Sequence, residues 1–291
     1  MREYEYHAPE SFGRLFELAS ADGVESRFLA GGTDLTPRIS AERNQIPRYK
    51  KPPLRILYLG ALGLDSVTDA GEDVTIGALC TLSSLLENAV VKAKLPALHE
   101  ALTEMAGVSI RNTATIGGNI MNASPAADSV PALLVLGTEC TLRSASGERR
   151  VALAEFFTEP GKTVAKPGEV LVSVTVKAGR GGSSFKKLGR RKAETLSVVN
   201  AAAYVELRDG VCEAVRVAVG SAAPTVVRCA DTERALVGRK IGEDSIRAAS
   251  SLVEKAISPI DDIRASAWYR GRVAPTVVAR AISAAAERKR G

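Results

Sequence analysis

The spacing of apolar residues predicts alternating helices and strands along the first 178 residues of this chain. Phe12, Leu15 and Ala19 recur at helical spacing and predict an amphipathic helix close to the N-terminus. The other elements expected in this part are strands at 28–30, 55–59, 73–78, 139–143 and 170–176, and helices at 82–90, 96–105 and 129–136.

The last third of the chain has a simpler pattern of strands followed by helices. Two apolar runs, at 202–207 and 211–219, flank an Asp-Gly pair at 209–210, which is typical of a β-hairpin. Alanine-rich helices expected near 246–256 and 276–287 would cover that hairpin. Strands and helices that are grouped in this way predict an α+β fold and argue against a doubly wound parallel sheet.

Two polar stretches divide the chain into three expected units. A proline-bearing segment from 40 to 53 is expected to link the first unit to the second, and a Gly/Ser-rich segment at 179–184 to precede the third. The predicted units therefore cover 1–54, 55–178 and 179–291.

Composition and charge exclude several classes of protein. The chain carries 39 basic and 33 acidic residues, a net charge of +6, and the basic residues are dispersed without an aromatic-interleaved stripe. We therefore expect no nucleic-acid partner, and interpret the basic surplus as a solvated or protein-docking surface. No apolar run reaches the ~20 residues that span a bilayer. The N-terminus lacks the apolar core of a signal peptide, so we expect a cytoplasmic protein without a membrane span.

The cysteines and histidines are too scattered to predict a metal site. No Cys-x-x-Cys or similar ligand spacing occurs, and isolated cysteines in such a chain are mostly buried apolar residues. The residues in question are Cys80, Cys140, Cys212, Cys229, His7 and His99.

Two Gly-Gly pairs carry the candidate chemistry. Gly117 and Gly118 stand within Thr115–Ser129, a stretch rich in small hydrogen-bonding side chains, and Gly31 and Gly32 follow an apolar run. Glycine allows positive φ and a close approach of the backbone to a ligand. Successive amides in such a turn form a concavity suited to phosphate. Neither pair has the spacing of a Rossmann or P-loop motif.

Together these motifs closely resemble the FAD-binding subunit of the molybdenum hydroxylases, the family of xanthine dehydrogenase and carbon monoxide dehydrogenase medium subunits. The resemblance rests on residues 30–35 (AGGTDL) and 110–119 (IRNTATIGGN), and continues through 124–129 and 185–191. It implies a two-lobed FAD-binding fold of the vanillyl-alcohol-oxidase/PCMH type, followed by a smaller α+β C-terminal domain.

The resemblance also implies where FAD binds. The pyrophosphate would rest on backbone N–H groups of both glycine loops, Asp128 would contact the adenosine end, and Leu171 and Lys186 would contact the flavin. A helix cap is the competing interpretation of Asp128, and a free surface side chain that of Lys186. The positions expected to bind FAD are Leu29, Ala30, Gly31, Gly32, Thr33, Asp34, Leu35, Thr115, Ile116, Gly117, Gly118, Asn119, Asn122, Ser124, Asp128, Leu171 and Lys186.

The family would make this chain an oxidoreductase subunit without catalytic or metal-binding residues of its own. A molybdenum-binding large subunit and a small subunit with [2Fe-2S] clusters would be its partners, and NAD, a quinone or oxygen the electron acceptor. Met105 stands where xanthine dehydrogenases often have an aromatic residue near the flavin, which leaves the acceptor open.

Two alternatives remain from the sequence. A stand-alone flavin oxidase of the same fold would often link FAD covalently through histidine or cysteine, and neither His7 nor His99 stands beside a glycine loop. A scaffold protein that has lost its flavin would not need two intact glycine loops.

Overall fold

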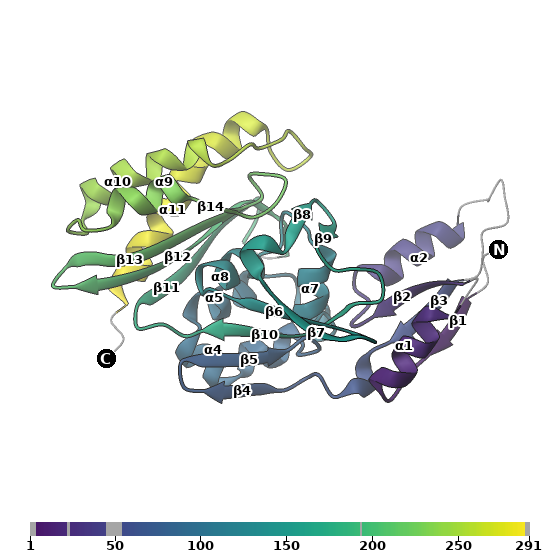
Figure 1. Cartoon of the computed structure of the whole chain (residues 1–291). Helices are drawn as coiled ribbons and strands as arrows, with labels where there is room; N and C mark the ends of the chain where they lie inside the picture. The colour runs from purple at the N-terminus through teal and green to yellow at the C-terminus, as the bar shows by residue number, and fades with distance from the viewer. Residues whose placement is uncertain (1–3, 22–23, 45–53, 193, 289–291) are drawn as a thin grey trace.

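The computed structural model describes residues 4–21, 24–44, 54–192 and 194–288, which form three units, each built around one main β-sheet (Figure 1). The units follow one another along the molecule in sequence order, and the second lies in the middle. Among the described helices, none combines the length and apolar character needed to cross a lipid bilayer.

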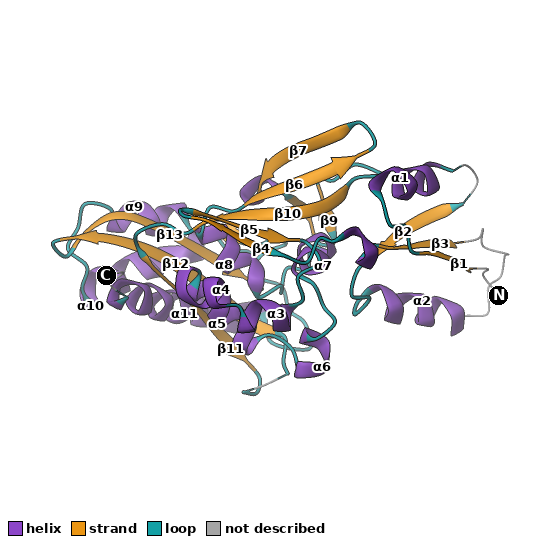
Figure 2. Cartoon of the chain, turned by 90° about the horizontal axis from the view of Figure 1, so that it is seen from below, coloured by secondary structure: helices purple, strands orange, loops and turns teal. Residues whose placement is uncertain are grey.

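The first unit, lobe 1, is a parallel three-stranded sheet in the order β1-β3-β2. The helix α1 packs Leu15 and Phe16 against Leu57 of the sheet, and α1 and α2 lie on opposite sides of the sheet (Figure 2). Its elements are β1 (Tyr4–His7), α1 (Phe12–Ser20), β2 (Glu25–Leu29), α2 (Leu35–Asn44) and β3 (Leu54–Tyr58).

Lobe 1 differs from expectation at its C-terminal end. The strand β3 pairs with both β1 and β2, so it belongs to lobe 1, and the expected boundary after residue 54 is too early. Residues 40–44 of the expected linker lie in α2, while 45–53 fall outside the described residues.

The second unit, lobe 2, is an antiparallel sheet in the order β4-β5-β10-β6-β7 with short helices packed against it. The strands are β4 (Val67–Ala70), β5 (Asp73–Gly77), β6 (Glu139–Ser144), β7 (Gly147–Ala152) and β10 (Val170–Lys177), and a small hairpin pairs β8 (Phe157–Glu159) with β9 (Lys162–Thr163). The α-helices are α3 (Leu82–Glu87), α4 (Ala89–Lys94), α5 (Pro96–Glu104), α6 (Val108–Arg111), α7 (Ile116–Asn122) and α8 (Ser129–Val135).

The helix expected at 82–90 is two helices. Thr81 caps α3 as predicted, by accepting a hydrogen bond from the Ser84 N–H. Asn88 then ends α3 and caps α4, because its side-chain oxygen accepts hydrogen bonds from the N–H groups of Val90 and Val91. Asparagine is a strong N-cap residue, and here it starts a new helix where one continuous helix was expected.

The third unit is a four-stranded antiparallel sheet covered on both faces. Helices α5 and α8 of lobe 2 pack on one face, and the long helix α11 packs on the other. Its strands are β11 (Gly182–Gly189), β12 (Ser197–Arg208), β13 (Val211–Gly220) and β14 (Val227–Arg228), and its helices are α9 (Ala230–Leu236), α10 (Glu243–Ser251) and α11 (Ala267–Glu287). Short 3-10 turns at Gly60–Leu62, Leu153–Glu155 and Leu252–Lys255 complete the fold.

The expected hairpin and C-terminal helices are present with shifted bounds. Asp209 and Gly210 both have positive φ, as a tight two-residue hairpin turn requires. The last helix begins at Ala267, nine residues before the expected start at 276, because the Ser266 side chain caps it by accepting from the Tyr269 N–H.

Candidate functional site

A cavity of about 390 Å³ opens where lobe 1 meets lobe 2. The strand β2 leads into the Gly31-Gly32 turn, which precedes α2, and on the opposite side stand α7 and the start of β10. The expected positions that line this first cavity are Leu29, Ala30, Gly31, Gly32, Thr33, Asp34, Leu35, Thr115, Gly117, Gly118, Asn119, Asn122 and Leu171. Thirteen of the seventeen residues expected to bind FAD therefore surround one cavity.

The first glycine pair holds the two lobes in close contact. Gly32 has a φ of +71°, a conformation that favours glycine. Gly31 lies against the other lobe, since a Cβ atom built on it would stand 1.8 Å from the carbonyl oxygen of Thr113. Only a residue without a side chain fits at this lobe–lobe contact.

This turn presents a row of open backbone donors. Within the described residues, the N–H groups of residues 31–35 donate no hydrogen bond, while the carbonyl of Gly32 accepts from the Thr36 N–H. Consecutive unpaired amides next to the N-terminus of the ten-residue helix α2 form a site suited to an anion.

The second glycine pair differs from the expected open loop, because it forms the first turn of α7. The Gly117 N–H donates to the Ala78 carbonyl at 2.9 Å, and the Gly118 N–H donates to the Thr115 hydroxyl at 3.0 Å. The N–H groups of Ile116 and Asn119 are also engaged, with the carbonyls of Cys80 and Thr115. The expectation that amides of both loops are open to a phosphate is therefore wrong for this loop. Its contribution to the cavity is the Thr115, Asn119 and Asn122 side chains.

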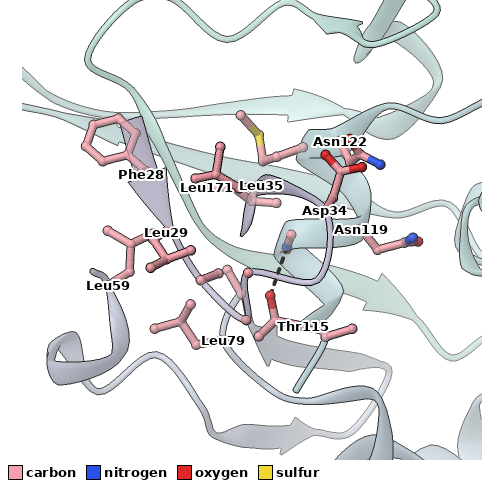
Figure 3. A pocket seen from close by; sticks show the side chains of 18 of the residues that line it. Phe28, Leu29, Asp34, Leu35, Leu59, Leu79, Thr115, Asn119, Asn122 and Leu171 are labelled. Carbon is pink, nitrogen blue, oxygen red and sulfur yellow. Dashed lines mark hydrogen bonds between the residues drawn. The ribbon is translucent and has the colours of Figure 1, made fainter. Parts of the chain in front are cut away.

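The first cavity has an apolar part and a polar part (Figure 3). Leu29, Leu59 and Leu79 gather on one side, and Asp34 and Asn122 lie together on another. A flat apolar group and an anionic group of one ligand can thus be held at the same time.

A second cavity, of about 460 Å³, lies next to the first and shares Asn119 and Asn122 with it. Met105, Ser124 and Asp128 line it, together with the loop between β11 and β12. The structure therefore places Asp128 with Met105, and it places Leu171 in the other cavity.

Asp128 is a buried hub and does not cap α8, since its side chain makes no capping bond. One carboxylate oxygen accepts from the Ser197 hydroxyl at 2.5 Å and the Asn200 amide at 2.7 Å, and the other pairs with Lys187 Nζ at 2.7 Å. The side chains of Asp128 and Lys187 are only 5% and 3% exposed. This network fixes the floor of the second cavity to the sheet of the third unit.

Two expected residues lie apart from both cavities. Lys186 is about one-third exposed, and its ammonium lies 3.7 Å from Glu100. Successive strand residues point to opposite faces of the sheet, so Lys186 points away from the face on which Lys187 meets Asp128. Ile116 is fully buried in the core of lobe 2.

Two polar residues at the site were not among the positions expected to bind FAD. Lys187 was recognisable only once the facing of β11 was known. Arg38 pairs with Asp34 four residues earlier, a helical spacing that the sequence does show, and it also reaches Asn122.

The surroundings of the first cavity shift the pKa of one carboxyl group and one thiol near it. Arg149 holds the pKa of Glu169 below its usual range by hydrogen bonding to its carboxylate, although burial opposes that effect. Burial raises the pKa of the Cys80 thiol to about 11, and all four cysteines are buried and free. Neither histidine lines either cavity. A covalent histidyl or cysteinyl flavin therefore has no suitable partner at these walls.

Known protein families match nearly the whole chain. Residues 2–176 match the family described as the FAD binding domain in molybdopterin dehydrogenase, and residues 183–285 match the CO dehydrogenase flavoprotein C-terminal domain. The chain is 31% identical over 280 residues to the glyceraldehyde dehydrogenase medium chain of Sulfolobus acidocaldarius, covering 96% of this chain and 97% of that one. It is also 31% identical over 283 residues to a putative xanthine dehydrogenase FAD-binding subunit of Escherichia coli, covering 96% and 95% of the two chains.

Solved structures agree with these families. A chain of carbon monoxide dehydrogenase from Hydrogenophaga pseudoflava superposes with a TM-score of 0.89 at 28% identity, over 97% of both chains. Reconstituted CO dehydrogenase from Oligotropha carboxidovorans gives a TM-score of 0.90 at 28% identity, over 98% of both. The resemblance seen in the glycine motifs is thereby confirmed: the chain belongs to the FAD-binding medium subunits of the molybdenum hydroxylase family of oxidoreductases.

Proposed function

We propose that this chain holds FAD as the electron-transfer subunit of a molybdenum- and iron–sulfur-containing hydroxylase or dehydrogenase. It would stand between the [2Fe-2S] clusters of a partner subunit, which supply electrons, and an external acceptor such as NAD, a quinone or oxygen. A molybdenum-binding large subunit would complete the complex, and its pocket would decide the substrate. Its predicted location is the cytoplasm.

The open amides of residues 31–35 are the observation that carries this proposal. A pyrophosphate placed there would receive charge-assisted hydrogen bonds, which are stronger than neutral ones. Asn119 and Asn122 border both cavities, so a ligand anchored at this point can extend into each. A dinucleotide, with a ring system on either side of a pyrophosphate, matches that shape.

We infer that the adenosine enters the first cavity and the isoalloxazine the second. The leucines beside Leu171 suit a purine ring, which needs mainly apolar contact. The second cavity offers polar groups for the hydrogen-bonding edge of a flavin, among them Ser124 and the Asp128 network. Its rim also carries Leu196, which is 60% exposed, where a protein partner can approach. In this arrangement Asp128 serves the flavin end and Leu171 the adenosine end, the reverse of the sequence-based expectation.

The division of labour then follows from the residues. Bound FAD supplies the redox chemistry, and the protein binds, orients and shields it. The turn at 31–35 would anchor the phosphates, the leucine-lined wall would exclude water from the adenosine, and the Asp128 network would hold the flavin-facing side chains in place.

Purification of the native assembly tests the proposal. Acid precipitation should release one FAD per chain into the supernatant, and a molybdenum-binding subunit and an iron–sulfur subunit should co-purify. Lack of flavin after reconstitution would refute FAD binding. A free flavoprotein that oxidises an organic substrate unaided would instead support the stand-alone oxidase.

Met105→Tyr tests the orientation of the cofactor. A phenol introduced into the second cavity would lie against the isoalloxazine and quench the fluorescence of bound flavin. Leu59→Met, which changes the wall of the first cavity conservatively, is the control and should leave the emission unchanged. Unquenched emission from Met105→Tyr with full FAD occupancy would contradict this orientation.

A further inference from the structure

Asp34 poses an electrostatic problem for the proposed ligand. Its carboxylate belongs to the wall of the first cavity, beside the amides that would receive a pyrophosphate. Two anions in that position repel each other, and the 45% exposure of the Asp34 side chain lets water screen only part of that repulsion. A site built for a dianionic group therefore needs something to offset this charge.

Arg38 provides the offset. Its Nε lies 2.8 Å from Asp34 Oδ2 and its second terminal nitrogen 3.2 Å from Asp34 Oδ1, so both carboxylate oxygens are engaged. Glu169, another carboxylate that lines this cavity, is paired in the same way with Arg149, at 2.6 and 2.7 Å. Each acidic group on the wall is thus paired with an arginine that contacts both of its carboxylate oxygens.

Arg38 also connects the two walls of the cavity. The nitrogen that reaches Asp34 Oδ1 donates to the side-chain oxygen of Asn122, in α7, at 3.1 Å. Among residues 35–41 of α2, the part whose side chains the structure describes, this is the only side-chain hydrogen bond to lobe 2. The cation thereby ties the solvent-facing surface of α2 to the opposite wall.

We propose that Arg38 is a positioning residue for the dinucleotide: it neutralises Asp34 beside the pyrophosphate and fastens α2 to α7 across the cavity. This inference rests on the proposed FAD function and adds a residue that lies outside both glycine motifs. Loss of Arg38 leaves Asp34 unpaired beside the phosphates, so FAD is bound more weakly and released faster.

The full-length chain, stripped of flavin and titrated with FAD, provides the test. Arg38→Met should raise the Kd for FAD about threefold to fivefold, the change expected for losing an ion pair whose side chains are 62% and 45% exposed, and should speed FAD release. Asp34→Asn/Arg38→Met should recover most of the affinity, because the repelling charge is gone. Arg14→Met removes an exposed arginine that pairs with Glu17 at 2.7 Å in the same lobe, and should bind FAD like the wild type.

The dependence of FAD affinity on salt concentration distinguishes an electrostatic role of Arg38 from a structural one. Added salt screens repulsion, so the affinity gap between Arg38→Met and the wild type should narrow as ionic strength rises. An unchanged Kd for Arg38→Met would overturn the inference, and so would a double variant as weak as the single one, or a gap that salt does not alter. Failure of the wild type to bind FAD would overturn the proposed function itself.

Discussion

Because Gly31 lies directly against the Thr113 carbonyl, adding one methyl group at Gly31 tests the importance of this contact between the lobes. Gly31→Ala would place a Cβ 1.8 Å from that oxygen, so the first turn and lobe 2 must move apart. We expect a loss of about 1–3 kcal/mol in the free energy of unfolding and much weaker FAD binding, because the open amides shift with the turn.

Gly13→Ala is the matched control for this substitution. Gly13 lies in α1 of the same lobe, and a Cβ atom added to it would have no neighbouring atom within 4 Å. Alanine there should be neutral or stabilising by up to about 1 kcal/mol. Urea unfolding and FAD titration of both variants check the prediction, and equal behaviour of the two would show that the lobe contact has little importance.

Neighbouring lysines of β11 offer a comparison at the scale of one element. Lys187→Met would leave Asp128 buried without its cation and should cost about 3–5 kcal/mol. Lys186→Met should cost under about 1 kcal/mol, because Lys186 is partly exposed and lies 3.7 Å from its partner carboxylate. Urea denaturation of the two variants measures the difference. Similar losses of unfolding free energy in both variants would mean that the Asp128–Lys187 pair adds little to the stability of the protein.

Single elements also show which features the sequence could predict. The hairpin at Asp209–Gly210 and the Thr81 cap depend on residues within a few positions of each other, and both were predicted. The choice between Lys186 and Lys187 depends on which face of β11 meets α8, and no local pattern reveals it.

Long-range contacts explain the errors at the site itself. The first glycine pair was placed correctly beside the cavity, because its role follows from its own turn. In the second loop, the Gly117 and Ile116 N–H groups are occupied by the carbonyls of Ala78 and Cys80, which lie more than thirty residues earlier in the chain. The link from Arg38 to Asn122 spans 84 residues. Partners that are distant in sequence are decided by the packed fold.

At the scale of the whole molecule, Glu100 joins lobe 2 to the third unit. Its carboxylate accepts from the Ser184 hydroxyl at 2.9 Å and the Phe185 N–H at 2.7 Å, and it pairs with Arg288. Burial favours the neutral acid, yet these donors and Arg288 keep the pKa of Glu100 below its usual 4.5.

This depressed pKa predicts how acid affects the attachment of the third unit. The stabilisation is complete above pH 4.5 and is lost as the pH falls through the lower folded-state pKa. Glu100→Gln should therefore be less stable than the wild type at neutral pH, and the difference should shrink below pH 4.5. Urea midpoints across this range measure it, and a constant difference down to about pH 3 would contradict the prediction.

The shared core between lobe 2 and the third unit limits how such chains can be recombined. Phe185, Ala202, Tyr204 and Ala218 of the C-terminal sheet are buried in the same cluster as the α5 and α8 side chains. A chimera that took only the segment after residue 182 from a relative would pack that relative's sheet residues against the α5 and α8 side chains of this chain, which were not matched to them. Productive crossovers must therefore carry α5 and α8 along with the sheet, although the two family matches meet near residue 180.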